Sequence, residues 1–100
     1  MEFEGPSENQ FTVYSKSGCH NCIKVKEVLN EYSNTYSYNT VDCDEYLVED
    51  KKKFIEFIKT YSGKEIKTFP IVFFNKKYVG GYNETVDYIA QLLAFEEKDF

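Results

Sequence analysis

Arginine and tryptophan are absent from this chain, and basic residues are scarce. Its 100 residues include 12 lysines against 17 aspartates and glutamates, which gives a formal net charge of −5 at pH 7. Proteins that bind nucleic acids neutralise phosphates with a basic excess, and they read guanine mainly through arginine. The composition therefore argues against a nucleic-acid partner.

Long apolar runs are missing as well. No stretch comes near the roughly 18 consecutive apolar residues that indicate a membrane-spanning helix, so we expect no membrane partner. Residues 1–10 are polar and acidic, without the basic start and apolar segment of a signal peptide. We therefore expect a cytoplasmic protein, in a compartment that keeps thiols reduced. An odd cysteine count of three agrees with this, because it argues against a secreted disulfide scaffold.

The length and composition predict one globular domain. One hundred residues suffice for a single modest core, and an apolar content of 42% lies within the globular range. Gly5 and Pro6 interrupt any early helix or strand. We therefore predict a flexible or loosely packed N-terminal arm at residues 1–9, followed by a single domain at residues 10–100.

Apolar periodicity predicts strands and helices in alternation. Strands are predicted at 10–15, 36–43, 71–74 and 78–79, and helices at 20–33, at 46–61 and after residue 83. Gly63 is predicted to cap the end of the second helix, and Asn83 to cap the start of the third. The order is βαβα followed by ββα. It predicts an α/β fold with a parallel pair of strands, a hairpin and a covering helix.

A pair of cysteines stands where the first predicted strand gives way to the first helix. Cys19 and Cys22 are three residues apart, and Cys19 falls at the helix N-terminus. The free N–H groups and partial positive charge there stabilise a thiolate, and Lys16 can add a cation. Cys22 lies one turn on, where it can resolve a mixed disulfide. This placement favours a dithiol redox site over a metal knuckle or a structural disulfide.

The third cysteine has a different setting. Cys43 ends the second predicted strand between two aspartates, whose negative charges raise a thiol pKa. We interpret it as structural or incidental rather than regulatory. A zinc site formed with Cys19, Cys22 and His20 is disfavoured, because Cys19 and His20 are adjacent and Cys43 belongs to another strand end.

Three motifs together resemble the glutaredoxin family within the thioredoxin fold. They are Ser15-Lys16-Ser17-Gly18-Cys19-His20-Asn21-Cys22, Thr68-Phe69-Pro70 and Gly80-Gly81-Tyr82-Asn83-Glu84. A lone C-x-x-C is a weak signal, but all three motifs in order make a strong one. The resemblance extends from about Phe11 to Leu93. It implies a thioredoxin-like βαβαββα domain, with a four-stranded mixed sheet flanked by helices.

The resemblance also implies roles for individual residues. Cys19 would be the nucleophile and Cys22 the resolving thiol, and the two would form the redox-active disulfide. Pro70 would follow a cis peptide bond that faces Cys19 and exposes the backbone of Phe69 to glutathione. The implied glutathione-binding residues are Lys16, Asn21, Thr68, Phe69, Pro70, Gly81, Tyr82, Asn83 and Glu84.

The two ends of glutathione call for different partners. The family binds the γ-glutamyl end at the corner that is Gly81–Glu84 here, where an acidic residue accepts from the amine. The glycyl carboxylate needs a cation, and Lys16 is the first candidate. On the second helix, Ile55 stands where relatives often carry a polar or basic residue. The other candidates on that helix are Lys52 and Lys53, which also suit an ordinary solvated charge run. Lys67, just before Thr68, is a further candidate.

We therefore predict a glutathione-dependent thiol–disulfide oxidoreductase that reduces protein–glutathione mixed disulfides and protein disulfides. Its partners would be glutathione and such oxidised proteins, and we expect a monomer. A reductant of the thioredoxin type is disfavoured, because thioredoxins usually carry a Trp before the first cysteine and Gly-Pro between the two. A redox-inactive interaction module is disfavoured by the intact thiol pair.

Two residues between the cysteines keep an alternative open. His20 and Asn21 replace the Pro and Tyr of the familiar dithiol motif. Some relatives without that proline bind a [2Fe–2S] cluster between two subunits, through the first cysteine and glutathione. An iron–sulfur carrier or sensor, with Cys19 as ligand, is thus the second prediction. His20 as an imidazolium would also favour the Cys19 thiolate, or it is an exposed residue without such a role.

Overall fold

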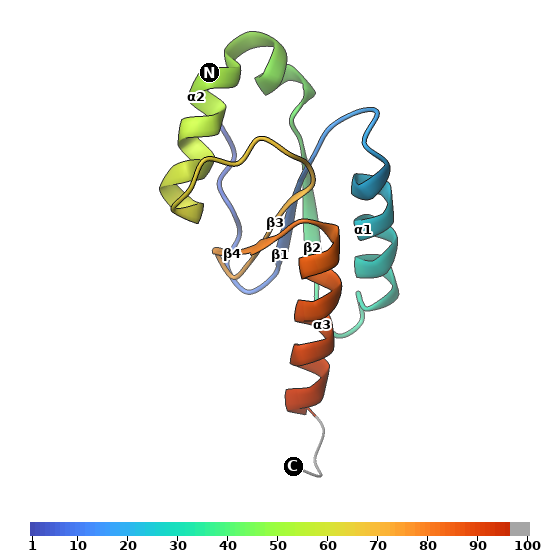
Figure 1. The fold of residues 1–100 in the computed structure, drawn as a ribbon. Helices are drawn as coiled ribbons and strands as arrows, with labels where there is room; N and C mark the ends of the chain where they lie inside the picture. Colours follow the sequence, from blue (N-terminus) through green and yellow to red (C-terminus); the bar gives the residue numbers. More distant parts are fainter. Residues whose placement is uncertain (97–100) are drawn as a thin grey trace.

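The computed structural model describes residues 1–96 and confirms the predicted βαβαββα order. The elements, shown in Figure 1, are β1 (Phe11–Ser15), α1 (His20–Glu31), β2 (Tyr38–Asp42), α2 (Asp44–Ser62), β3 (Ile71–Phe74), β4 (Lys77–Gly80) and α3 (Tyr82–Glu96). Among the helices of this part of the chain, none has both the length and the apolar character needed to cross a membrane.

The four strands form one mixed sheet in the order β2-β1-β3-β4. β1 pairs in parallel with β2, while β1–β3 and β3–β4 are antiparallel pairs. The turn between β3 and β4 consists of Asn75 and Lys76, which both have positive φ, 51° and 67°. Two such residues match the twist of the hairpin strands, so the predicted hairpin is confirmed.

Helices cover both faces of this sheet, with α2 on one face and α1 and α3 on the other (Figure 1). The α2 cluster contains Tyr14, Val41, Cys43, Phe54, Ile58, Ile66, Ile71 and Phe73. The α1/α3 cluster contains Phe11, Val13, Val25, Leu29, Val72 and Ile89. Successive residues of β1 and β3 enter opposite clusters, because side chains alternate along a strand. This confirms that the apolar run at residues 71–74 is a strand covered on both faces.

The boundaries of α2 differ from the prediction. The helix begins at Asp44 rather than at residue 46. Its first turn therefore includes two acidic residues, Asp44 and Glu45, which suit the positive end of the helix dipole. It ends at Ser62, and the following Gly63 adopts a left-handed conformation (φ 80°), which confirms the predicted cap. Within the helix, Asp50 has non-helical angles (φ −156°, ψ 59°), so α2 is kinked there.

The N-terminal arm (residues 1–9) contains no helix or strand, but its contacts differ from those of a loosely packed arm. Phe3 lies against Tyr46, Phe54 and Phe57, with ring centroids 4.9, 5.5 and 5.3 Å away. The buried Tyr14 hydroxyl donates to the carbonyl of Glu4 (2.8 Å). An aromatic residue in a polar segment was the signal for this docking, and periodicity analysis passes over such isolated residues.

Replacing Phe3 should therefore destabilise the whole domain. We expect Phe3→Ala to lower the free energy of unfolding by about 1–3 kcal/mol, because it removes a half-buried ring from three aromatic contacts. Urea denaturation followed by circular dichroism measures this loss. The exposed neighbour Glu2 provides the control, Glu2→Ala, which should unfold like the wild type. Equal stability of Phe3→Ala and wild type would show that the arm contributes nothing.

Candidate functional site

Cys19 and Cys22 form a disulfide at the start of α1. Cys19 is the N-cap of the helix, and its Sγ accepts a hydrogen bond from the Cys22 N–H (3.2 Å). Cys19 is partly exposed, whereas Cys22 is only 1% exposed. The two thiols thus differ in burial. An incoming disulfide can reach Cys19 but not Cys22.

The turn before Cys19 is held by a residue that the sequence analysis missed. The Ser17 N–H donates to Asp44 Oδ1 (2.8 Å), and the Ser17 hydroxyl donates to Asp44 Oδ2. These two hydrogen bonds lower the pKa of the Asp44 carboxyl, and the nearby charge of Lys16 adds to the effect. Asp44 thereby ties the active-site turn to the first turn of α2. In the sequence it was visible only as a charge beside Cys43.

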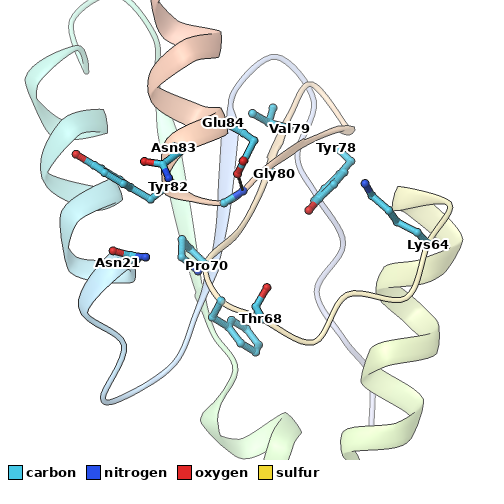
Figure 2. Close-up of a pocket in the computed structure, with 12 residues that line it drawn as sticks. Asn21, Lys64, Thr68, Pro70, Tyr78, Val79, Gly80, Tyr82, Asn83 and Glu84 are labelled. Carbon is cyan, nitrogen blue, oxygen red and sulfur yellow. Dashed lines mark hydrogen bonds between the residues drawn. The ribbon is translucent and has the colours of Figure 1, made fainter.

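A cleft of about 430 Å³ opens between the loop before β3, strand β4 and the start of α3 (Figure 2). Its lining residues are Asn21, Lys64, Thr68, Phe69, Pro70, Tyr78, Val79, Gly80, Gly81, Tyr82, Asn83 and Glu84. Every residue predicted to bind glutathione lines this cleft except Lys16. Lys16 lines a neighbouring depression instead, which also contains Phe69.

The middle of the cleft is formed by the Thr68-Phe69-Pro70 segment. The peptide bond between Phe69 and Pro70 is cis, as predicted. Pro70 is buried, and the ring of Phe69 stacks at 6.4 Å on that of Phe54 from α2. The segment is therefore anchored in the α2 cluster on one side and borders the cleft on the other.

The start of α3 corrects the prediction that Asn83 is its N-cap. The helix already begins at Tyr82, and the preceding Gly81 takes the capping position. Its carbonyl accepts from the Thr85 N–H (3.0 Å) and hydroxyl (2.7 Å), and its N–H donates to Glu84 Oε1 (2.8 Å). Glycine has no capping side chain, so Glu84 reaches back to satisfy the free N–H group.

Position 80 requires glycine, because the backbone there passes close to the side chain of Glu84. It has φ +139°, and a Cβ built on it would lie 2.6 Å from the Cβ of Glu84. No larger residue fits without displacing Glu84 or the backbone. The Gly-Gly pair thus allows Glu84 to fold over the chain at the edge of the cleft.

The lysines proposed for the glycyl carboxylate lie in different places. Lys52 and Lys67 line a depression beside α2, together with Lys51 and Ile55. Lys67 also pairs with Glu65 (3.1 Å). Lys53 does not line this depression and pairs with Asp50 (3.8 Å). Lys51, which the sequence analysis did not consider, also lines the depression that contains Lys16.

Lys64 and Tyr78 also line the cleft without having been predicted. Lys64 follows the cap of α2, and its Nζ lies 5.2 Å from the centroid of the Tyr78 ring. Burial raises the pKa of the Tyr78 hydroxyl, and the negative charge of Glu84 raises it further. No local sequence pattern joins these residues, because the α2–β3 loop and the edge strand meet only in the folded chain.

Cys43 is a free, fully buried thiol at the start of α2. Its Sγ donates to the carbonyl of Val41 (3.6 Å). Burial, with the charge of Asp42, raises its pKa to about 12, in the predicted direction. Within residues 1–96, no three His, Cys, Asp or Glu side chains gather in a way that could hold a metal ion. A [2Fe–2S] cluster shared between two subunits through Cys19 and glutathione would not need such a group, so that alternative stays a prediction.

Comparison with known proteins identifies the family. A model of the glutaredoxin family matches residues 11–79. The chain belongs to the glutaredoxin family. It is therefore assigned to a family of thiol–disulfide oxidoreductases, and the thioredoxin fold predicted from its motifs is confirmed.

Individual glutaredoxins resemble this one over most of its length. Glutaredoxin 1 of Rickettsia conorii is 35% identical over 75 residues, which cover 75% of this chain and 67% of the relative. The structure of reduced Escherichia coli glutaredoxin has a TM-score of 0.68 and 26% identity, covering 85% of this chain and 98% of that one. A buckwheat glutaredoxin–glutathione complex has a TM-score of 0.64 and 24% identity, covering 83% of this chain and 70% of that one.

The Asp44–Ser17 contact predicts a pH-dependent stability. Because the folded pKa of Asp44 lies below its ordinary 3.8, its contribution is complete above that pH and is lost as the pH falls through the folded value. We expect wild type to be more stable than Asp44→Ala at pH 7, with a difference that shrinks under acid. Urea unfolding over a pH series measures it. A difference that does not change with pH would contradict the role of the carboxylate charge.

Cys43 should be inert in the native protein. A thiol that is buried and has a pKa of about 12 carries almost no thiolate at neutral pH. After reduction we expect Cys19 to react quickly with an aromatic disulfide reagent. Cys22 then attacks the Cys19 sulfur of that mixed disulfide, so that both reagent thiolates are released in the fast phase. Cys43 should react only after denaturation. Cys43→Ser should leave the fast phase unchanged. Three rapidly reacting thiols in the folded protein would contradict the buried position.

Proposed function

We propose that this glutaredoxin is a glutathione-dependent thiol–disulfide oxidoreductase that reduces protein–glutathione mixed disulfides and protein disulfides. The arrangement that carries the proposal is the pair of unequal thiols, Cys19 and Cys22, at the start of α1. The cleft formed by the motifs at Thr68–Pro70 and Gly81–Glu84 supports glutathione as the ligand. The complex of the similarly folded buckwheat glutaredoxin with glutathione agrees with this choice.

In the first step the thiolate of Cys19 attacks the glutathione sulfur of a protein–glutathione mixed disulfide. A new disulfide forms between Cys19 and glutathione, and the protein sulfur leaves as a thiolate that takes up a proton. The N-terminus of α1 favours the Cys19 thiolate, and the Cys22 N–H points at its Sγ (3.2 Å). The partial exposure of Cys19 lets a large substrate approach.

A second glutathione completes the cycle. Its thiolate attacks the glutathione sulfur bound to Cys19, which releases glutathione disulfide and returns the Cys19 thiolate. With a protein disulfide, Cys19 first forms a mixed disulfide with the client. Cys22 then attacks the Cys19 sulfur, so that the client leaves reduced and the Cys19–Cys22 disulfide forms. Two glutathione molecules reduce that disulfide, at a potential of roughly −200 to −230 mV.

The cleft residues would orient glutathione for these steps. The backbone of Phe69, beside the cis peptide bond, would pair with the central part of the tripeptide. Asn83 and Glu84 would take its γ-glutamyl end. Lys16, in the neighbouring depression, would face its glycyl carboxylate.

Cysteine variants test this division of roles. Cys19→Ser should lose both reactions by more than about 100-fold, because no other exposed thiol replaces the nucleophile. Cys22→Ser should keep the reduction of mixed disulfides but lose the reduction of protein disulfides. A glutathione-coupled assay with each substrate class measures both, and Cys43→Ser is the matched control.

Mass spectrometry adds an independent readout. Cys22→Ser incubated with oxidised glutathione should carry one glutathione on Cys19. Full activity of Cys19→Ser, or an adduct on Cys43, would overturn the proposal. A coloured dimer after anaerobic reconstitution with iron, sulfide and glutathione would instead support the iron–sulfur alternative.

A further inference from the structure

The turn before Cys19 lies between two chain segments, and the N-terminal arm contacts both of them. One segment is the end of β1, where the Ser15 carbonyl accepts from the Cys43 N–H (2.8 Å). The other is the start of α2, where Asp44 holds Ser17 through two hydrogen bonds. The position of the turn therefore depends on how the first turns of α2 lie against β1.

The first turns of α2 are weakly attached to the core. Cys43, just before them, is buried, but none of the residues from 44 to 50 is. The two buried residues of α2, Phe54 and Ile58, both come after the kink at Asp50. Because the helical geometry is interrupted at the kink, the packing of these two side chains does not by itself fix the direction of the part before it.

The ring of Phe3 spans this kink. Its centroid lies 4.9 Å from that of Tyr46, which comes before the kink. It lies 5.5 and 5.3 Å from the centroids of Phe54 and Phe57, which come after the kink. The contacts with Tyr46 and Phe54 are edge-to-face, an arrangement that aromatic rings favour. One partly buried side chain of the arm thus holds both parts of α2 together.

The backbone of Glu4 joins the first part of α2 to β1. Its N–H donates to the Tyr46 hydroxyl (3.1 Å), and its carbonyl accepts from the Tyr14 hydroxyl (2.8 Å). Tyr14 is fully buried and immediately precedes Ser15 in β1. Tyr46 follows Asp44 by two residues in α2. One residue of the arm therefore bridges the two segments between which the turn is held.

We propose that the N-terminal arm, through Phe3 and Glu4, positions the turn that presents Cys19 and thereby raises the reactivity of its thiol. The two residues act through α2 and β1 and not on the sulfurs, so they are positioning residues. The inference rests on the proposed function only in taking Cys19 as the nucleophile.

The effect falls on the charged form of the thiol. The free N–H groups at the start of α1 stabilise the Cys19 thiolate, and they stabilise the neutral thiol far less. This advantage requires that the Cys19 sulfur stay beside the Cys22 N–H, 3.2 Å away. When the contact between Asp44 and Ser17 loosens, the turn gains other conformations in which the thiolate is less favoured.

The rate at which iodoacetamide alkylates Cys19 over a pH series tests the proposal, because only the thiolate reacts. All variants carry Cys22→Ser, and mass spectrometry assigns the product to Cys19. On the rising part of the profile we expect Phe3→Ala to slow alkylation about 3-fold, because a charge-assisted hydrogen bond is weakened. Tyr46→Phe keeps the ring but removes the acceptor of the Glu4 N–H, so it should slow alkylation about 2-fold. The plateau at high pH should not change in either variant.

Two control variants separate positioning from general stability. Ile58→Val removes a methylene group from the α2 cluster after the kink, so it should lower the stability and leave the alkylation profile unchanged. Glu2→Ala, at an exposed position of the arm, should change neither. Thermal unfolding of each variant verifies that the fold is kept under the conditions of the assay.

A double-mutant cycle tests the route through Asp44. Phe3→Ala should slow alkylation when Asp44 is present and have no further effect in Asp44→Ala, because both changes then act on the same contact. Equal effects of Phe3→Ala in the two backgrounds would overturn the proposal. A profile that Ile58→Val shifts as far as Phe3→Ala does would overturn it as well.

Tyr46→Phe decides the question if Phe3→Ala does not fold, and an unchanged profile in Tyr46→Phe would then count against the arm. Alkylation needs no glutathione, so these outcomes are independent of the co-substrate. The proposed function fails by a different result, which is a wild type that reduces no glutathione mixed disulfide.

Discussion

The double burial of β1 is the constraint on which the site depends. Phe11 and Val13 pack beneath α1 and α3, Tyr14 packs beneath α2, and all three are fully buried. Each such side chain contributes about 1.5–3 kcal/mol through its removal from water. β1 pairs with both β2 and β3, so its register in the sheet is fixed on both sides. The position of its last residue, Ser15, is therefore fixed as well. Cys19 follows four residues later, so the core sets the position of the proposed nucleophile.

Hydrogen bonds from the start of α2 fix the turn before Cys19 to the end of β1. The Cys43 N–H donates to the Ser15 carbonyl (2.8 Å), and Asp44 holds Ser17 through two hydrogen bonds. Two ends of parallel strands thus lie together, as they do in α/β proteins generally. A polar turn needs such anchoring, because Lys16, Ser17 and Gly18 are exposed and contribute little buried surface.

The three cysteines show how burial divides the chemistry. Cys19 is reachable from solvent, Cys22 is reachable only from Cys19, and Cys43 lies in the α2 cluster. A thiol inside apolar surroundings keeps its proton, whereas one at a helix N-terminus loses it readily. Within the proposed mechanism, the same residue type therefore serves as nucleophile, resolving thiol and core residue in one small domain.

Every helix and strand of the fold could be predicted from the sequence. The helical and the strand-like spacing of apolar residues are both strong here, and the two-residue hairpin turn and Gly63 mark where elements end. Sequence reasoning also identified most of the cleft, since Thr68–Pro70 and Gly81–Glu84 are local motifs with recognisable geometry. It missed Asp44 and Lys64, whose contacts join distant parts of the chain, and it made one local error at the start of α3. Asn83 was taken for a cap because the reach of Glu84 to Gly81 depends on the close approach at Gly80.

The sequence by itself determined the order of elements, the family and the identity of the redox pair, because each depends on residues close together in the chain. Only the tertiary structure decided that Phe3 belongs to the core, that Asp44 holds the turn at Ser17, and that Lys64 lies beside Tyr78. These contacts join residues 14 to 54 positions apart in the sequence. No periodicity or motif encodes such pairs, and they form only when burial of the two apolar clusters brings the segments together.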